Sequence, residues 1–224
     1  MKKIAYLTID DAPSKDFRKK IDYLSLKNIP AIIFCEGGCI KKRPKEVIYA
    51  IRKGFIIGNH SYNHQHFSKI PLKECFEEIK KTNELIEEIY KKSKIKRPIK
   101  LFRFPYGDRG GKNKKKLEEY LKFLGYKQPR FEKINYFWYK FGRFHKHPDI
   151  FWTFNIKEYE IGKKKFGNQT IDSIYNLIDK SYRLKSSSRD IILIHDHHDT
   201  TKYFNSLINR LLKKGIKFKM PQLK

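Results

Sequence analysis

The feature that most constrains the fold is an alternation of short β-rich runs with longer amphipathic runs along the 224 residues. Short apolar runs bounded by turn residues favour strands, and apolar residues at helical spacing favour helices. The strand candidates are Ile4–Ile9, Ala31–Cys35, Phe55–Ile57, Leu101–Phe104, Ile150–Phe154, Ile191–Ile194 and Ile216–Phe218. The helix candidates are Asp16–Lys27, Pro44–Lys53, Pro71–Lys92, Asn113–Phe123, Thr170–Leu184 and Thr200–Lys213.

This alternation predicts an α/β fold built on a mainly parallel sheet or barrel. The length fits one domain over residues 1–224. Hydrophobic residues make up 39% of the chain, which supplies a core and excludes a disordered protein despite 33% charged residues. One segment does not follow this alternation of strands and helices. Lys127–Asp149 is aromatic and basic, and it is predicted to be an insertion or elaborated loop.

The formal net charge of +27 favours anionic partners such as nucleic acid, anionic lipid or acidic cell-wall polymers. Basic residues recur along the whole chain, so compositional drift is the simpler interpretation, with affinity for anionic polymers as the alternative. The three cysteines form no CxxC pair and are expected to be buried free thiols. No run approaches the roughly 18 apolar residues of a membrane span. The expected location is the cytoplasm if Met1 is the native start, with a removed export signal as the alternative.

Polar side chains follow several of the candidate strands, at the positions where parallel α/β folds gather catalytic groups. Asp10 and Asp11 follow the first strand, and adjacent carboxylates need a cation or an arginine to neutralise them. His60 and His64 have ligand spacing for a divalent metal if the second residue opens a helix. Two imidazoles and one carboxylate would leave coordination positions open, as catalytic zinc requires. Later strands are followed by Arg103-Phe104-Pro105-Tyr106 and His195-Asp196.

Each of these signals is weak alone, but together and in this order they resemble the motifs of the polysaccharide deacetylases (NodB-homology, carbohydrate esterase family four). The first motif, commonly TFDDGP, resembles Thr8–Pro13, and the second, H-(S/T)-x-x-H, matches His60–His64. The third, R-x-P-Y, matches Arg103–Tyr106. The fourth resembles Trp152–Tyr159, and the fifth, L-x-H, matches Leu193–His195. The resemblance covers nearly the whole chain.

The resemblance implies a distorted (β/α) barrel with an open groove, a divalent metal and hydrolysis of the acetamide of an N-acetylated sugar. The metal implied is zinc first, with cobalt or nickel as alternatives. By position, Asp11, His60 and His64 would hold the metal. Asp10 would be the general base that takes a proton from the attacking water, and Arg103 would pair with it and orient it.

The remaining motif residues would complete the reaction and bind the sugar. The backbone N–H of Tyr106 would stabilise the oxyanion together with the metal. His195 would protonate the departing amine, with Glu158 expected to polarise it. Leu193 would wall the pocket for the acetyl methyl group, and Trp152 and Tyr106 would contact substrate.

Departures from the family pattern predict local differences. Ala12 replaces the usual Gly, which would strain the backbone if that position needs a positive φ. Glu158 replaces an Asp and adds a methylene, and Tyr159 stands for a Trp. None of these changes removes a metal ligand or a proton carrier, so an active enzyme is expected.

The insertion Lys127–Asp149 is not part of the family pattern, and we expect it to line or cap the substrate groove. Flat aromatic rings suit the apolar face of a sugar. The alternative is that the rings pack the loop onto the barrel. The rings expected to stack on sugar are Tyr136, Trp138 and Tyr139, and the cations expected to meet acidic substituents are Lys140, Arg143 and Lys146.

Two other functions remain open from the sequence. One is a related metal-dependent amidohydrolase that acts on a non-glycan amide or a cyclic imide. The other is a basic glycan- or nucleic-acid-binding protein on an inactive scaffold. The intact set of Asp10, His60, His64 and His195 favours an enzyme over the inactive scaffold.

Overall fold

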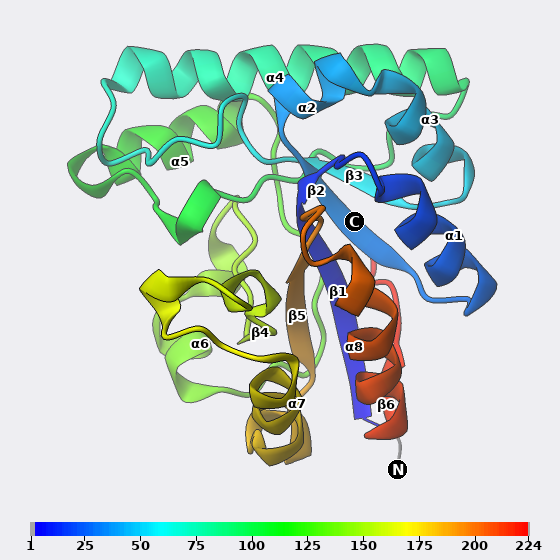
Figure 1. The fold of residues 1–224 in the computed structure, drawn as a ribbon. Helices are drawn as coiled ribbons and strands as arrows, with labels where there is room; N and C mark the ends of the chain where they lie inside the picture. The colour runs from blue at the N-terminus through cyan, green and yellow to red at the C-terminus, as the bar shows by residue number, and fades with distance from the viewer. Residues whose placement is uncertain (1–2, 224) are drawn as a thin grey trace.

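The computed structural model describes residues 3–223, and its centre is a parallel sheet in the order β3-β2-β1-β5-β4, with β6 also pairing with β1 (Figure 1). Every pairing between these strands is parallel. The α/β fold with a parallel sheet predicted from the sequence is therefore confirmed. The strands are β1 (Lys3–Ala12), β2 (Ala31–Cys35), β3 (Ile56–Asn59), β4 (Phe154–Asn155), β5 (Asp190–His195) and β6 (Ile216–Phe218).

Helices cover the outer face of this sheet. The main ones are α1 (Phe17–Leu26), α3 (Pro44–Arg52), α4 (Leu72–Ser93), α5 (Lys114–Phe123), α7 (Ile171–Lys180) and α8 (Thr201–Lys213), with the shorter α2 (Gly37–Lys42). The short helix α6 (Phe137–Phe141) belongs to the insertion and packs on the inner face instead. Neighbouring contacts run in the series α5-α4-α3-α1-α8-α7 (Figure 1). A sheet flanked by such a partial ring of helices has the layout of an open, distorted barrel.

The core divides between the two faces of the sheet because successive strand residues point to opposite sides. On β2, Ile33 faces the cluster beneath α1, α3 and α8, whereas Ile32 and Phe34 face a second cluster inside the barrel. The central strands are buried on both faces, so their sequences are continuous apolar runs rather than alternating ones, as in Ile191–Ile194.

The insertion fills the inner face of the barrel. Tyr136 and Tyr139 are 9% and 2% exposed and pack in the inner cluster with Tyr6. The Tyr136 hydroxyl donates a hydrogen bond to Asp190 Oδ1 at 2.8 Å. The prediction that Tyr136 and Tyr139 stack on substrate is therefore wrong, because both rings are needed to cover the inner sheet face. The cations Lys140, Arg143 and Lys146 lie exposed at the surface.

Two predicted strands are shorter than expected or absent. Within Leu101–Phe104, Phe102 forms only isolated parallel bridges, to Asn59 and Asp149. Pro105 follows directly and cannot donate to a ladder, which limits extension of this segment. Within Ile150–Phe154 only Phe154 belongs to a strand, β4. The chain still follows the parallel order here, so Arg103 reaches the same end of the barrel as the true strands.

The helices lie close to their predicted positions, with one shortened. The predicted helix Thr170–Leu184 ends at Lys180 and continues as a separate 3₁₀ turn at Arg183–Lys185. Its start is fixed by a capping box between Thr170 and Ser173. Within residues 3–223, no helix has the length and apolar character required to cross a membrane.

Candidate active site

The carboxyl ends of β1, β3 and β5 meet at a cavity of about 520 Å³. β1 and β5 are paired so that Asp10 lies beside His195, and His60 follows β3 directly. Of the ten residues predicted from the sequence, eight line this cavity: Asp10, Asp11, His60, His64, Tyr106, Trp152, Leu193 and His195. The other two, Arg103 and Glu158, are buried behind it, at 1% exposure each.

Asp11, His60 and His64 converge on one point. Asp11 Oδ1 lies 3.3 Å from His60 Nε2 and 3.1 Å from His64 Nε2, and the ligand atoms of all three lie within 4.8 Å of one another. His60 Nδ1 lies 2.8 Å from the carbonyl oxygen of Arg103. A carbonyl only accepts, so Nδ1 carries the hydrogen, and in the neutral ring Nε2 turns a lone pair toward Asp11.

Lone pairs that face one another across a buried space need a cation between them. Asp11 Oδ1 is buried and has no hydrogen-bond partner among the described residues. One carboxylate and two imidazoles form a donor set suited to zinc and to similar divalent ions, with coordination positions left open. The three residues therefore fit a catalytic divalent metal.

The same convergence controls the charges of these groups. Burial raises the pKa of Asp11, but the hydrogen bond with His197 and the close imidazoles of His60 and His64 outweigh burial and hold the pKa well below the usual range. Burial lowers the pKa of His60, and the negative charges of Asp10 and Asp11 outweigh it and raise that pKa. The carboxylate is therefore ionised and ready to bind a cation.

The loop from His60 to His64 is not the start of a helix, contrary to the expectation from its spacing. It turns sharply instead, with positive φ at Ser61 (64°) and His64 (55°). Glu78 on α4 holds this turn, since its carboxylate accepts hydrogen bonds from the backbone N–H of Tyr62 (2.9 Å) and Asn63 (2.7 Å). The turn held by the buried Glu78 thus brings His60 and His64 together, whereas the sequence predicted that a helix would do so.

The replacement of glycine by Ala12 does not place an alanine at a positive φ. Ala12 lies in β1 and pairs with Cys35 of β2. The positive φ in this stretch falls on Asp11 (62°) instead. Aspartate tolerates this region better than most residues, so the left-handed backbone occurs at the metal ligand itself.

Asp10 is held by a buried arginine. Arg103 Nη1 donates to Asp10 Oδ1 at 2.7 Å and to Thr8 Oγ1 at 2.9 Å, and Arg103 Nε donates to the carbonyl of Ile150 at 3.0 Å. The guanidinium carbon lies 4.4 Å from the centroid of the Phe34 ring. Asp10 Oδ2 remains on the metal side, 3.6 Å from His60 Nε2. One carboxylate oxygen is thus fixed and the other faces the reaction space.

His195 is paired with Glu158. Glu158 Oε1 accepts hydrogen bonds from the backbone N–H of His195 at 2.6 Å and from its Nδ1 at 2.9 Å. The longer side chain of glutamate therefore reaches the histidine. Burial lowers the pKa of His195, but the charge and hydrogen bond of Glu158 outweigh burial and raise that pKa to about 9. At neutral pH the ring is an imidazolium that can donate a proton.

We expect the Glu158→Gln variant to lose activity at a lower pH than the unchanged protein. Because the pKa of His195 is raised to about 9, its proton is present below that pH and is lost as the pH rises through it. Removal of the Glu158 charge leaves burial to lower the pKa of His195, so the alkaline limb of kcat/KM should move to lower pH. The measurement is kcat/KM from neutral to alkaline pH for both proteins. Coincident alkaline limbs would contradict the assignment of His195 as the acid.

Several residues that line the cavity escaped the sequence analysis, among them Glu36, Lys163, Lys165 and His197. His197 Nε2 lies 2.6 Å from Asp11 Oδ2. Its position two residues after His195, in a histidine-rich run, could have identified it as a candidate site residue. Lys163 and Lys165 lie at a short 3₁₀ turn, Lys164–Phe166. Neither hydrophobic periodicity nor a motif distinguishes them from the other lysines of a basic chain.

A second cavity of about 1020 Å³ adjoins the first. The two share Trp152 and Asn155 in their linings, and Trp138 of the insertion lines the second one. The Phe151 and Trp152 rings are stacked at this junction, with centroids 4.5 Å apart. Of the three insertion rings predicted to stack on sugar, Trp138 is therefore the one for which a place in the groove remains a prediction.

Comparison with known proteins agrees with this geometry. The profile described as polysaccharide deacetylase matches residues 1–129. Over 103 residues the chain is 34% identical to a peptidoglycan-N-acetylglucosamine deacetylase of Bacillus cereus, covering 46% of this chain and 36% of that protein. Over 82 residues it is 34% identical to a chitooligosaccharide deacetylase of Rhizobium leguminosarum, covering 36% and 38%. The matched segments thus span little more than a third of the length of these relatives.

Solved structures share the fold over nearly the whole chain. A family 4 carbohydrate esterase from Streptomyces lividans superimposes with a TM-score of 0.67 at 21% identity, covering 97% of this chain and 92% of that one. A family pseudoenzyme from Bacillus anthracis gives 0.65 at 19% identity, covering 97% and 63%. The fold is therefore common to enzymes and a pseudoenzyme. With the matching profile over more than half of its length and the five motifs in order, this chain belongs to the polysaccharide deacetylase family.

Proposed function

We propose that this protein is a metal-dependent hydrolase that removes acetyl groups from an N-acetylated sugar or glycan. The observation that carries the proposal is the arrangement around one cavity: the group formed by Asp11, His60 and His64 lies with Asp10 and His195 in the same lining. Amide hydrolysis needs an activated water and an acid for its poor leaving group. This site has a candidate for each task.

The residues divide the reaction among them. A bound divalent cation would supply a more acidic water and polarise the acetamide carbonyl. Asp10 takes the proton of the attacking water, with Arg103 holding its carboxylate in place. His195 then donates its proton to the departing amine. The backbone N–H of Tyr106, in a left-handed conformation (φ 58°), is the candidate donor to the developing oxyanion.

We assign zinc as the metal, with cobalt or nickel able to replace it. Two imidazole nitrogens and one carboxylate oxygen are common ligands of catalytic zinc. Cobalt and nickel are divalent ions of the same row that also bind such nitrogen and oxygen ligands, so either can replace zinc at this site. The donor set lacks the all-oxygen character that magnesium or calcium prefer.

The substrate proposed is a glycan that carries acidic groups, such as peptidoglycan, rather than a neutral chitooligosaccharide. Relatives are named for both substrates. Lys163 and Lys165 line the same cavity as the proposed catalytic residues, and positive charge in a cleft raises the local concentration of an anionic substrate. Trp152 offers an aromatic face for a sugar ring in the same lining.

The test is acetate release by the zinc-loaded protein from peptidoglycan and from N-acetylglucosamine oligomers. We expect acetate from both and a higher kcat/KM on peptidoglycan. In the Lys163→Gln, Lys165→Gln double variant the preference should shrink, and added salt should shrink it in the unchanged protein. A cyclic imide and simple N-acyl amines serve as comparison substrates. Turnover of these with no acetate from any glycan would contradict the proposal.

A further inference from the structure

His197 contacts the oxygen of Asp11 that the metal-ligand group leaves free. Asp11 Oδ1 faces His60 and His64, whereas Oδ2 lies 2.6 Å from His197 Nε2. The two residues are 186 positions apart in the sequence. His197 belongs to none of the five motifs, so the family pattern does not account for this contact.

We propose that His197 is a positioning residue that donates a hydrogen bond from Nε2 to Asp11 Oδ2 and so directs Oδ1 to the metal. An ionised carboxylate only accepts hydrogen bonds, so the nitrogen facing it carries the hydrogen. A carboxylate with one oxygen held in this way cannot rotate freely about its terminal bond. It then meets the cation in one geometry, which favours binding. The inference rests on the proposed function only in taking Asp11 as a metal ligand.

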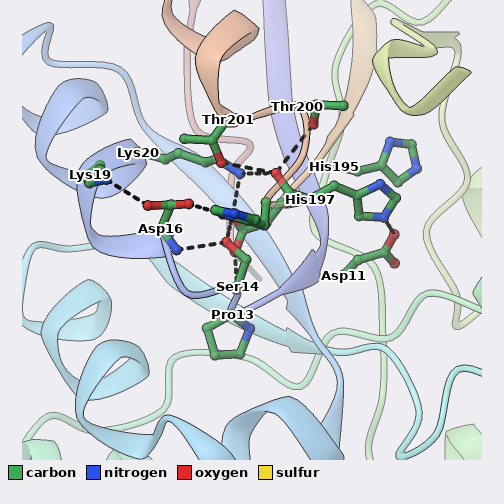
Figure 2. A network of polar contacts seen from close by, with 12 residues as sticks. Asp11, Pro13, Ser14, Asp16, Lys19, Lys20, His195, His197, Thr200 and Thr201 are labelled. Carbon is green, nitrogen blue, oxygen red and sulfur yellow. Dashed lines mark hydrogen bonds and ion pairs between the residues drawn. The ribbon is translucent and has the colours of Figure 1, made fainter. Parts of the chain in front are cut away.

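The loop that carries His197 is anchored by a buried ion pair. Lys20 Nζ lies 2.5 Å from Asp196 Oδ1, and the two side chains are 2% and 0% exposed. Lys20 also donates to the carbonyl oxygen of His197 at 3.0 Å (Figure 2). Buried pairs of this kind often contribute more to a unique geometry than to stability. Here the pair fixes the backbone on either side of the His197 α-carbon.

Further contacts hold the same loop against the segment after β1. Asp196 accepts hydrogen bonds from the backbone N–H of Ser14 at 2.6 Å and from its hydroxyl at 2.9 Å. The Thr201 hydroxyl, at the start of α8, donates to the His197 carbonyl at 3.1 Å. Figure 2 shows the contacts of Lys20 and Thr201 meeting at the His197 carbonyl, while the ring of His197 extends away from them toward Asp11. The ring is therefore held against the carboxylate by a fixed backbone.

The geometry favours His197 as a hydrogen-bond partner of Asp11 rather than as a fourth metal ligand. The group of ligand atoms within 4.8 Å of one another consists of Asp11, His60 and His64. His197 instead meets Asp11 from the side of Oδ2. A partner of a ligating carboxylate tunes affinity without changing the atoms bound to the ion.

The experiment compares His197→Ala and His197→Gln with the unchanged full chain, using zinc and cobalt ions without substrate. Zinc affinity, measured by competition with a chromophoric chelator, should fall about ten- to a hundredfold in His197→Ala, the usual effect of losing an outer partner. The glutamine amide can donate a hydrogen bond, so His197→Gln should recover part of the loss. The absorption bands of bound cobalt should keep their positions and intensity, because the ligand set is unchanged.

His198→Ala is the matched control. His198 is the neighbouring histidine, contacts Asp16 rather than Asp11 and has a half-exposed side chain. Its loss should leave zinc affinity close to that of the unchanged protein. Unaltered affinity in His197→Ala would overturn the inference, and so would cobalt bands that change as they do on loss of a ligand. Metal affinity is read without substrate, so failure of the glycan assay leaves this result standing, and the converse also holds.

Discussion

Replacement of His60 by alanine is expected to abolish both metal binding and acetate release. His60 belongs to the proposed metal-ligand group with Asp11 and His64, and the carbonyl of Arg103 holds the ring in the tautomer that a metal requires. A site with only two protein ligands keeps neither the affinity nor the geometry for catalysis. The measurements are metal content after dialysis and the rate of acetate release. A chelator should likewise abolish the activity of the unchanged protein, with recovery on addition of zinc or cobalt.

His66→Ala is the control for this prediction. His66 lies two residues beyond the metal-ligand loop and stacks on the ring of Tyr106, with centroids 3.9 Å apart. Its removal deletes the same side chain near the same cavity without removing a ligand, so metal content should be retained. Thermal unfolding of both variants checks that the chain still folds. Full activity of chelated protein without any divalent ion would refute the metal assignment.

Asp10→Asn is expected to keep the metal and lose roughly two to four orders of magnitude in rate, the usual contribution of a general base. Asparagine has the shape of aspartate but cannot take a proton. It also leaves the buried charge of Arg103 unpaired, which costs about 3–5 kcal/mol of stability when one partner of a buried pair is removed. The rate must therefore be measured well below the midpoint of thermal unfolding of the variant.

Asp11→Asn is the matched variant for this prediction, because it changes the adjacent carboxylate in the same way. It should lose the metal, whereas Asp10→Asn should retain it. Metal content and single-turnover rates of the two variants separate the roles. If Asp10→Asn loses the metal and Asp11→Asn retains it, the two aspartates exchange assignments.

The sequence predicted which residues gather at this cavity better than it predicted the extent of two of the strands. Asp10 and His195 lie near the carboxyl ends of β1 and β5, and His60 directly follows β3. The edge of a parallel sheet brings such positions together. The segment Leu101–Phe104 has the composition of a strand, yet Phe102 forms only isolated bridges. Composition reports burial, which this segment has, but it does not report whether a continuous partner strand is available.

The wrong predictions share one cause, namely contacts between residues that lie far apart in the sequence. His60 and His64 converge through a turn held by Glu78, a residue of another helix, rather than through a helix of their own. Tyr136 and Tyr139 have the composition of a sugar platform, but they cover the inner sheet face. No local pattern specifies the contact between His197 and Asp11, because it joins opposite ends of the sequence.

The position of β1 between β2 and β5 also determines which part of the site can form first during synthesis. Asp11, His60 and His64 all precede β5 by more than a hundred residues, so β2 and β3 can pair beside β1 before β5 is made. The other neighbour, β5, begins only at Asp190, and strand pairing across such a separation slows folding. A nascent chain therefore has its proposed metal ligands long before it acquires His195, and the proposed hydrolysis requires that β5 has paired with β1.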